Sequence, residues 1–286
     1  MALWRLFEWG RCNTQPLLAV HGWLDNAASF LGLGKYLEMF HMVAIDLPGH
    51  GWSDHRGPQA AYHLVDYLAD LLDVADALGW ERFGLLGHSL GAGIARVFAG
   101  TFPERVTELF LIDGIGPMSC NPDGVPAQLQ EALLRHRERT RRESRVFPDL
   151  ATAVQARQRT GDLGRESAEC LVKRAVMQVD GGYSWRHDHR LILPSRLYMT
   201  EEQVLAFLRS ITAPTLLVRS SNGLINRFKP NQRIASIPGI SVVELTGGHH
   251  LHMNNPFPVV MEIERFHNPL FPNEEVEGKK SEKPTL

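Results

Sequence analysis

The feature that most constrains the fold is the stretch from Phe83 to Gly93, which reads FGLLGHSLGAG. Its apolar first half is typical of a buried strand, and the small residues after it are typical of a helix that lies close to a sheet. The chain must reverse between the two within about two residues, which places Ser89 in a strained backbone conformation. Gly87 and Gly91 lack the Cβ atoms that would obstruct this turn. The G-x-S-x-G pattern therefore predicts a nucleophile elbow, which lifts a serine hydroxyl clear of the sheet at a helix N-terminus.

Strands and helices alternate along the first part of the chain. Apolar runs predict buried strands at 16–20, 41–45 and 106–112, in addition to the one before the elbow, and an exposed edge strand at 3–9. Helices are expected at 27–38 and 62–78. This alternation predicts an α/β fold in which helices cover both faces of a mostly parallel sheet.

The alternation stops at Pro117, and a stretch without regular strands follows to about Leu205. We expect an inserted helical cap there. Regular elements return with a strand at 214–219, a helix at 231–237, a strand at 241–245 and a helix at 256–266. The predicted organisation is an α/β core in two parts (1–116 and 206–272), the helical cap (117–205) and a disordered tail (273–286).

An arginine-rich segment lies inside the expected cap. Residues 128–145 contain six arginines among three glutamates. The first interpretation is a solvated helix with i,i+4 ion pairs between Glu131 and Arg135 and between Glu138 and Arg142. The alternative is a basic rim that recruits an anionic substrate.

Charge and cysteine content exclude several classes of protein. The net charge of −2 provides no general attraction to nucleic acid, so no nucleic-acid partner is expected. Cys12, Cys120 and Cys170 are odd in number and widely spaced, which suits a reducing compartment better than a disulfide framework. The sequence has neither a signal peptide's apolar region nor an apolar stretch long enough for a membrane span. We therefore expect a cytoplasmic protein, and leave its oligomeric state open.

Four segments together resemble one known family. They are His21–Asn26, Asp46–Gly51, the elbow and Gly247–Met253. The chain resembles the α/β-hydrolase superfamily over everything except the cap and the tail, and its first and last segments are similar to the serine hydrolase-like branch of small esterases. The resemblance implies the α/β-hydrolase fold and a serine hydrolase, which needs no cofactor, acting on a small-molecule carboxylic ester of small or medium acyl chain. Thioesterase, lactonase and C–C bond hydrolase activities stay open, as does a non-catalytic ligand-binding relative.

A serine nucleophile needs a base in contact with it, because its hydroxyl pKa is too high for unaided attack. The candidates are the histidines near the end of the core: His249, His250, His252 and His267. In the superfamily the catalytic histidine follows a glycine and precedes the proline of the final helix by seven residues. His249 fits this register with Pro256, and His250 is the second choice. No carboxylate or cysteine lies beside these histidines in sequence, so we expect no metal site.

The position of the acid that would orient the catalytic histidine departs from the commonest pattern of the superfamily. The loop at 220–226, its usual position, contains no Asp or Glu, although Asn222 could orient a neutral imidazole. Asp113 ends the strand after the elbow helix, so this strand should neighbour that of Ser89, and both side chains should reach the crevice at the carboxyl ends of the strands. We therefore assign the acid to Asp113. The alternative is an aspartate that caps the turn before Gly114.

The oxyanion formed during acyl transfer needs two backbone N–H donors. Leu90, the residue after the nucleophile, supplies one, and the resemblance places the other at Trp23. The Trp23 indole could in addition line an acyl pocket or simply pack. Asp25 and Asp46 are interpreted as structural residues that bind backbone amides in their turns.

Overall fold

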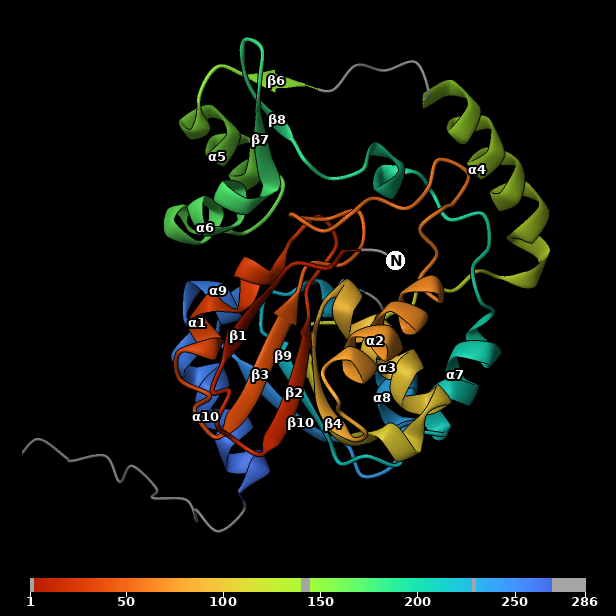
Figure 1. The fold of residues 1–286 in the computed structure, drawn as a ribbon. Coiled ribbons are helices and arrows are strands. Elements are labelled where there is room, and N and C mark those ends of the chain that lie inside the picture. Colours follow the sequence, from red (N-terminus) through yellow and green to blue (C-terminus); the bar gives the residue numbers. More distant parts are fainter. Residues whose placement is uncertain (1–2, 140–144, 228–229, 269–286) are drawn as a thin grey trace, which may run out of the picture.

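The computed structural model describes residues 3–139, 145–227 and 230–268 (Figure 1). Within these residues a seven-stranded sheet has the order β1-β3-β2-β4-β5-β9-β10. The strands are β1 (Leu6–Trp9), β2 (Gln15–Val20), β3 (Phe40–Ile45), β4 (Phe83–His88), β5 (Val106–Ile112), β9 (Thr215–Ser220) and β10 (Ser241–Leu245). β1 is the antiparallel edge strand, and the other neighbours pair in parallel. The predicted mostly parallel sheet is confirmed.

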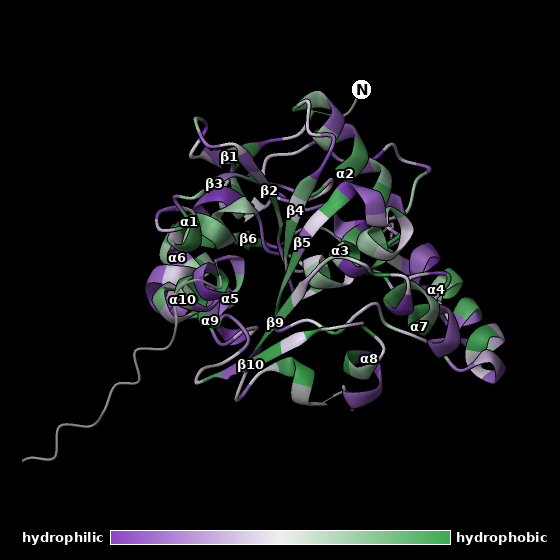
Figure 2. Cartoon of the chain, turned by 90° about the horizontal axis from the view of Figure 1, so that it is seen from below, coloured by the Kyte–Doolittle hydropathy of each residue, from purple (hydrophilic) through white to green (hydrophobic). Residues whose placement is uncertain are grey.

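Alternating side chains of the strands build a hydrophobic core on each face of the sheet. In β2, Leu17 and Ala19 pack into one core, whereas Leu18 and Val20 pack into the other, as the two-residue period of a strand requires. Figure 2 shows the predominantly hydrophobic strands β4 and β5 between two groups of helices. Burial on both faces explains why the strands appear in the sequence as continuous apolar runs.

Helices cover both faces, as predicted. On one face lie α1 (Leu31–Gly34), α9 (Leu251–Asn254) and α10 (Pro256–His267), and on the other α2 (Asp66–Ala77), α3 (Leu90–Thr101), α7 (Glu201–Arg209) and α8 (Asn231–Ala235) (Figure 1). The helix expected at 27–38 is instead a 3₁₀ turn, Ala27–Phe30, followed by the single turn α1. Glycine weakens this segment, and a Cβ on Gly34 would lie 2.5 Å from the Trp9 ring. The second expected helix begins at Asp66, four residues later than predicted.

The segment expected to be a helical cap contains both helices and strands. Its helices are α4 (Val125–Arg139), α5 (Leu150–Arg159) and α6 (Arg165–Ala175). β6 (Val146–Phe147), β7 (Val176–Val179) and β8 (Gly182–Trp185) form a small antiparallel sheet that the sequence analysis did not predict. Strands of two to four residues are too short for a two-residue period to be recognised. The tail at 273–286 and the Glu138–Arg142 pair lie outside the described residues.

A buried ion pair connects the cap to the core. Arg174 of α6 places its Nε 2.8 Å from Oδ2 of Asp46, which follows β3, and the two side chains are only 7% and 0% exposed. Asp46 also accepts hydrogen bonds from the backbone N–H groups of Ala27 and Trp52, which confirms its predicted role in the turn. The ion pair therefore attaches α6 of the cap to the loop that follows β3.

We expect Arg174→Met to lower the free energy of unfolding by about 3–5 kcal/mol, because it leaves the Asp46 carboxylate buried without its counter-charge. Arg165→Met on the same helix is the matched control. Its pair with Glu169 is solvent-exposed, so the change should be below about 1 kcal/mol. Urea unfolding of both variants measures the difference. Equal losses of unfolding free energy in the two variants would show that the buried ion pair contributes no more to stability than the exposed one.

Candidate active site

Ser89 occupies the sharp turn between β4 and α3. Its backbone has φ 52° and ψ −110°, a conformation that non-glycine residues rarely adopt. The turn is possible because its neighbours approach closely: a Cβ on Gly91 would lie 1.9 Å from the carbonyl oxygen of Val20. The strand–turn–helix unit expected from the G-x-S-x-G pattern is therefore present, with the serine at the N-terminus of α3.

His249 lies between Ser89 and Asp113, in the loop between β10 and α9. Its Nε2 is 2.9 Å from Ser89 Oγ, and its Nδ1 is 2.7 Å from Asp113 Oδ2. Because an ionised carboxylate can only accept, Nδ1 carries the hydrogen and the lone pair of a neutral imidazole faces the serine hydroxyl. The structure thus brings together the three residues that the sequence analysis assigned as nucleophile, base and acid.

The loop at 220–226, which has no carboxylate of its own, holds the Asp113 carboxylate in place through its backbone N–H groups. Asp113 is 1% exposed and accepts hydrogen bonds from the backbone N–H groups of Ser220 (3.2 Å) and Leu224 (3.0 Å). A Cβ on Gly223 would lie 2.2 Å from its Oδ2, so the loop can approach this closely only with glycine there. β4 and β5 are neighbours with His88 opposite Ile112, as the assignment of Asp113 requires.

The two residues expected to donate to the oxyanion line the same cavity as Ser89. Leu90 is the first residue of α3, where backbone N–H groups have no carbonyl partner inside the helix. Trp23 follows β2, is 52% exposed, and donates its indole N–H to the carbonyl of Leu191 in the cap at 3.0 Å. The indole therefore both lines the cavity and contacts the cap.

The cavity above Ser89 has a volume of about 1640 Å³. Apolar side chains from the segment after β5 and from the cap form much of its wall: Ile115, Met118, Leu193, Leu197 and Met199. Arg135 of α4 also reaches the wall, and it pairs with Glu131 at 2.8 Å, which is one of the two predicted i,i+4 pairs. A pocket of this kind suits a ligand with a substantial apolar part.

His250, the second choice for the base, directs both of its ring nitrogens at carboxylates rather than at Ser89. Its Nδ1 is 2.6 Å from Asp162 Oδ1, and its Nε2 is 3.4 Å from Asp25 Oδ2. Burial alone would lower the pKa of His250, but the negative charges of Asp25 and Asp162 outweigh it and raise the pKa to about 9. A residue held in this way cannot serve Ser89 as a base.

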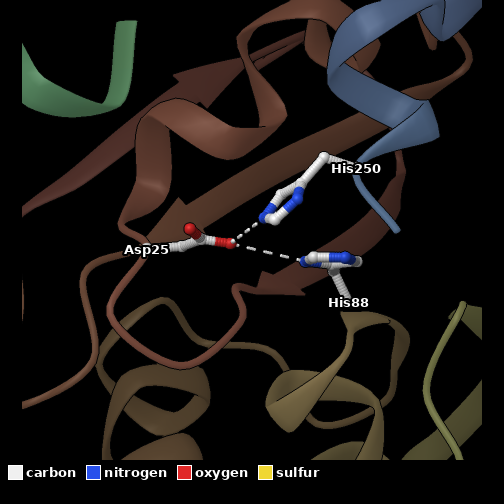
Figure 3. Close-up of side chains that lie close together, drawn as sticks. All are labelled: Asp25, His88 and His250. Carbon is white, nitrogen blue, oxygen red and sulfur yellow. Dashed lines mark ion pairs between the residues drawn. The ribbon is translucent and has the colours of Figure 1, made fainter. Parts of the chain in front are cut away.

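Sequence reasoning missed the surroundings of Asp25. Its carboxylate accepts from Arg157 of α5 at 2.6 Å and faces the rings of His88 and His250, rather than binding amides of its own turn as expected (Figure 3). Burial lowers the pKa of His88 to about 4, so this ring is neutral. Only the pairing of loops distant in sequence brings these groups together, and no local pattern signals it.

Comparison with known proteins identifies the family. Residues 15–256 match the family model described as alpha/beta hydrolase fold. The chain belongs to the α/β-hydrolase family. The predicted resemblance to the serine hydrolase-like branch is also confirmed, since a serine hydrolase-like protein of Danio rerio is 32% identical, with 93% of this chain and 85% of that protein covered. Serine hydrolase-like protein 2 of Homo sapiens is 29% identical over 90% of this chain and 88% of that protein.

Solved structures lead to the same fold. A hypothetical protein from Pseudomonas aeruginosa PAO1 is 40% identical with a TM-score of 0.88, covering 94% of this chain and 96% of that one. A thioesterase domain from the curacin biosynthetic pathway is 27% identical with a TM-score of 0.79, covering 92% and 95%. The α/β-hydrolase fold is therefore established, together with a hydrolase as the class of protein.

None of the helices in the described part of the chain has the length and apolarity needed to cross a bilayer.

Proposed function

We propose that this α/β-hydrolase is a serine hydrolase that cleaves carboxylic esters of small or medium acyl chain through an acyl-enzyme. The observation that carries the proposal is the continuous hydrogen-bonded line from Ser89 Oγ through His249 to the buried carboxylate of Asp113. A serine at the elbow, rather than an aspartate, suits acyl transfer, whereas opening an epoxide or displacing a halide through an alkyl-ester intermediate needs a carboxylate nucleophile.

In this mechanism Ser89 attacks the acyl carbonyl while His249 takes the serine proton. Asp113 fixes the imidazole tautomer and stabilises the imidazolium that forms. The backbone N–H groups of Trp23 and Leu90 hold the oxyanion of the tetrahedral intermediate. His249 then gives the proton to the leaving alcohol, and a water molecule, activated by the same histidine, releases the acid from Ser89.

A fluorophosphonate probe tests the nucleophile and the class of chemistry together. We expect labelling of wild-type protein at one site, in the peptide that contains Ser89, and no labelling of Ser89→Ala. Ser195→Ala is the matched control, because Ser195 lines the same cavity and its hydroxyl is bound to the Leu197 carbonyl. A wild-type chain that neither reacts with the probe nor turns over p-nitrophenyl acetate would instead support a non-catalytic ligand-binding relative.

The apolar cavity predicts a preference among acyl chains. We expect kcat/KM for p-nitrophenyl esters to rise from acetate to octanoate, since each buried methylene contributes about 0.8 kcal/mol, or at most about fourfold. The measurement is a series of esters that differ only in acyl length, corrected for background with Ser89→Ala. A preference for acetate would contradict the assignment of this cavity to the acyl group.

A thioester is the second candidate substrate, because one similar structure is titled a thioesterase domain. Both ester types would use the same serine and the same cavity, so the leaving group alone distinguishes them. Comparing octanoyl thioester and octanoyl oxygen ester at equal concentration decides between them. A much higher kcat/KM for the thioester, after correction for their intrinsic reactivity, would favour the second candidate.

A further inference from the structure

Three buried side chains, Asp25, His88 and His250, converge on one point (Figure 3). Oδ2 of Asp25 is 3.5 Å from Nδ1 of His88 and 3.4 Å from Nε2 of His250, and the three atoms all lie within 4.8 Å of one another. The three side chains are 1%, 0% and 6% exposed, respectively. The mechanism proposed above uses none of the three.

The hydrogen bond between His88 and the backbone of His249 fixes the tautomer of the His88 ring. Nε2 of His88 is 2.9 Å from the backbone carbonyl oxygen of His249, which can only accept, so Nε2 carries the hydrogen. In the neutral ring Nδ1 is then a bare lone pair directed at the Asp25 carboxylate. This fully buried nitrogen has no hydrogen-bond partner in the part of the chain that the structure describes.

His250 and Asp25 are likewise oriented by hydrogen bonds to residues outside the cluster. Nδ1 of His250 is 2.6 Å from a carboxylate oxygen of Asp162, so it carries a hydrogen and Nε2 is the atom left to face Asp25. Arg157 donates to Oδ1 of Asp25 at 2.6 Å and leaves Oδ2 for the two rings. Histidine ligands of metals are oriented in this manner, with the second ring nitrogen donating to a carboxylate or a backbone carbonyl.

The distances of 3.5 Å and 3.4 Å from Asp25 Oδ2 to the two ring nitrogens fit a tetrahedral cation. Zinc bonds of about 2.0–2.2 Å at tetrahedral angles place neighbouring ligand atoms roughly 3.3–3.5 Å apart. Octahedral bonds of about 2.1 Å would need roughly 3.0 Å. Gly22 leaves room beside the group, because a Cβ there would lie 2.9 Å from both Asp25 Oδ2 and His88 Nδ1. Asp162, which contacts Nδ1 of His250, is 35% exposed.

We propose that Asp25, His88 and His250 bind one divalent transition-metal cation, with zinc preferred and water as the fourth ligand. Nitrogen and carboxylate oxygen donors suit this ion. Each ligand is next to, or two residues from, a part of the candidate active site: Asp25 follows Trp23, His88 precedes Ser89, and His250 follows His249. The cation is a positioning element that ties these three loops together without touching the reacting atoms.

The proposal is independent of the substrate, so its test measures binding on the full chain. Metal-free protein is loaded with Zn²⁺, separated by gel filtration and analysed for metal content. We expect about one zinc per chain, and a melting temperature that rises by about 4 °C at a free zinc concentration of 100 times Kd. Loading with Co²⁺ should give the intense visible absorption of tetrahedral coordination.

Four variants locate the bound ion. Asp25→Asn and His250→Gln should abolish stoichiometric binding, and Asp162→Asn, which removes only an outer partner, should weaken it about 10- to 100-fold. His252→Gln is the matched control: its ring lies 4.2 Å from that of His88, but its Nε2 is bound to Ser29 Oγ. It should keep the wild-type affinity.

The alternative occupant of this site is a proton on His250, which would leave Nδ1 of His88 without a partner. Wild-type protein that retains less than a tenth of an equivalent of zinc and shows no thermal shift would overturn the metal proposal in favour of that proton. Zinc that is lost in His249→Gln but retained in Asp25→Asn would also overturn it, because the ion would then sit on the candidate base. Neither result bears on whether Ser89 reacts with fluorophosphonate.

Discussion

The Ser89→Ala variant is expected to lose about 10⁴- to 10⁶-fold in kcat on p-nitrophenyl octanoate while keeping the melting temperature of the wild type. The loss is large because no other group can form the acyl-enzyme once Oγ is removed. The fold should tolerate the change, because the hydroxyl lies at the cavity and the His249 ring to which it is hydrogen-bonded is also held by Asp113. Steady-state kinetics and thermal melting of the same preparation measure both effects.

The double variant Ser89→Ala/His249→Ala sharpens this expectation. If the two residues act as one unit, removing the histidine from a chain that already lacks the serine should cost little more. Independent contributions would instead multiply, and the double variant would be far slower than either single one. Near-normal turnover of Ser89→Ala would remove Ser89 as the nucleophile and with it the proposed mechanism.

The adjacency of β4 and β5 and the elbow between β4 and α3 could be predicted because local rules determine them. Gly87 and Gly91 around Ser89 allow one kind of turn, and consecutive strands of an α/β unit tend to be neighbours in the sheet. That adjacency is sufficient to bring Asp113 toward Ser89, since parallel strands end at the same edge. The absence of a carboxylate at 220–226 pointed the same way, although the backbone support that this loop gives to Asp113 could not be foreseen.

Contacts that depend on how the cap docks could not be predicted. Asp25 meets Arg157 across 132 positions of sequence, and nothing near either residue specifies the other. The expectation that Asp25 binds amides of its own turn was therefore wrong. The same expectation was right for Asp46, which accepts from the N–H of Trp52 in its own turn and in addition from the N–H of Ala27. The metal interpretation was dismissed for want of a carboxylate in sequence, but the fold supplies Asp25 from the loop after β2.

Asp113→Asn is expected to lower kcat by about 10⁴-fold. In the wild type the Asp113 carboxylate accepts from Nδ1 of His249 at 2.7 Å, so the neutral imidazole presents a lone pair to Ser89. An asparagine can turn its NH₂ group toward Nδ1, which then becomes the acceptor and leaves a hydrogen on the nitrogen that faces the serine. The amide also provides no negative charge to stabilise the imidazolium. Measuring kcat over a range of pH tests whether the loss of kcat in Asp113→Asn persists at high pH, where hydroxide is abundant.

In the rival assignment Asn222 orients the His249 imidazole and Asp113 only caps a turn. Measurements of kcat, rather than of stability, distinguish this assignment from ours. Asparagine has one acceptor oxygen where Asp113 uses two, toward the N–H groups of Ser220 and Leu224, so the melting temperature should fall in either case. Asn222→Ala is the matched control, with an expected change in kcat below about tenfold, because at most one neutral hydrogen bond is lost. If Asp113→Asn keeps more than about a tenth of the wild-type kcat while Asn222→Ala loses more, Asp113 is a cap and the acid must be sought elsewhere.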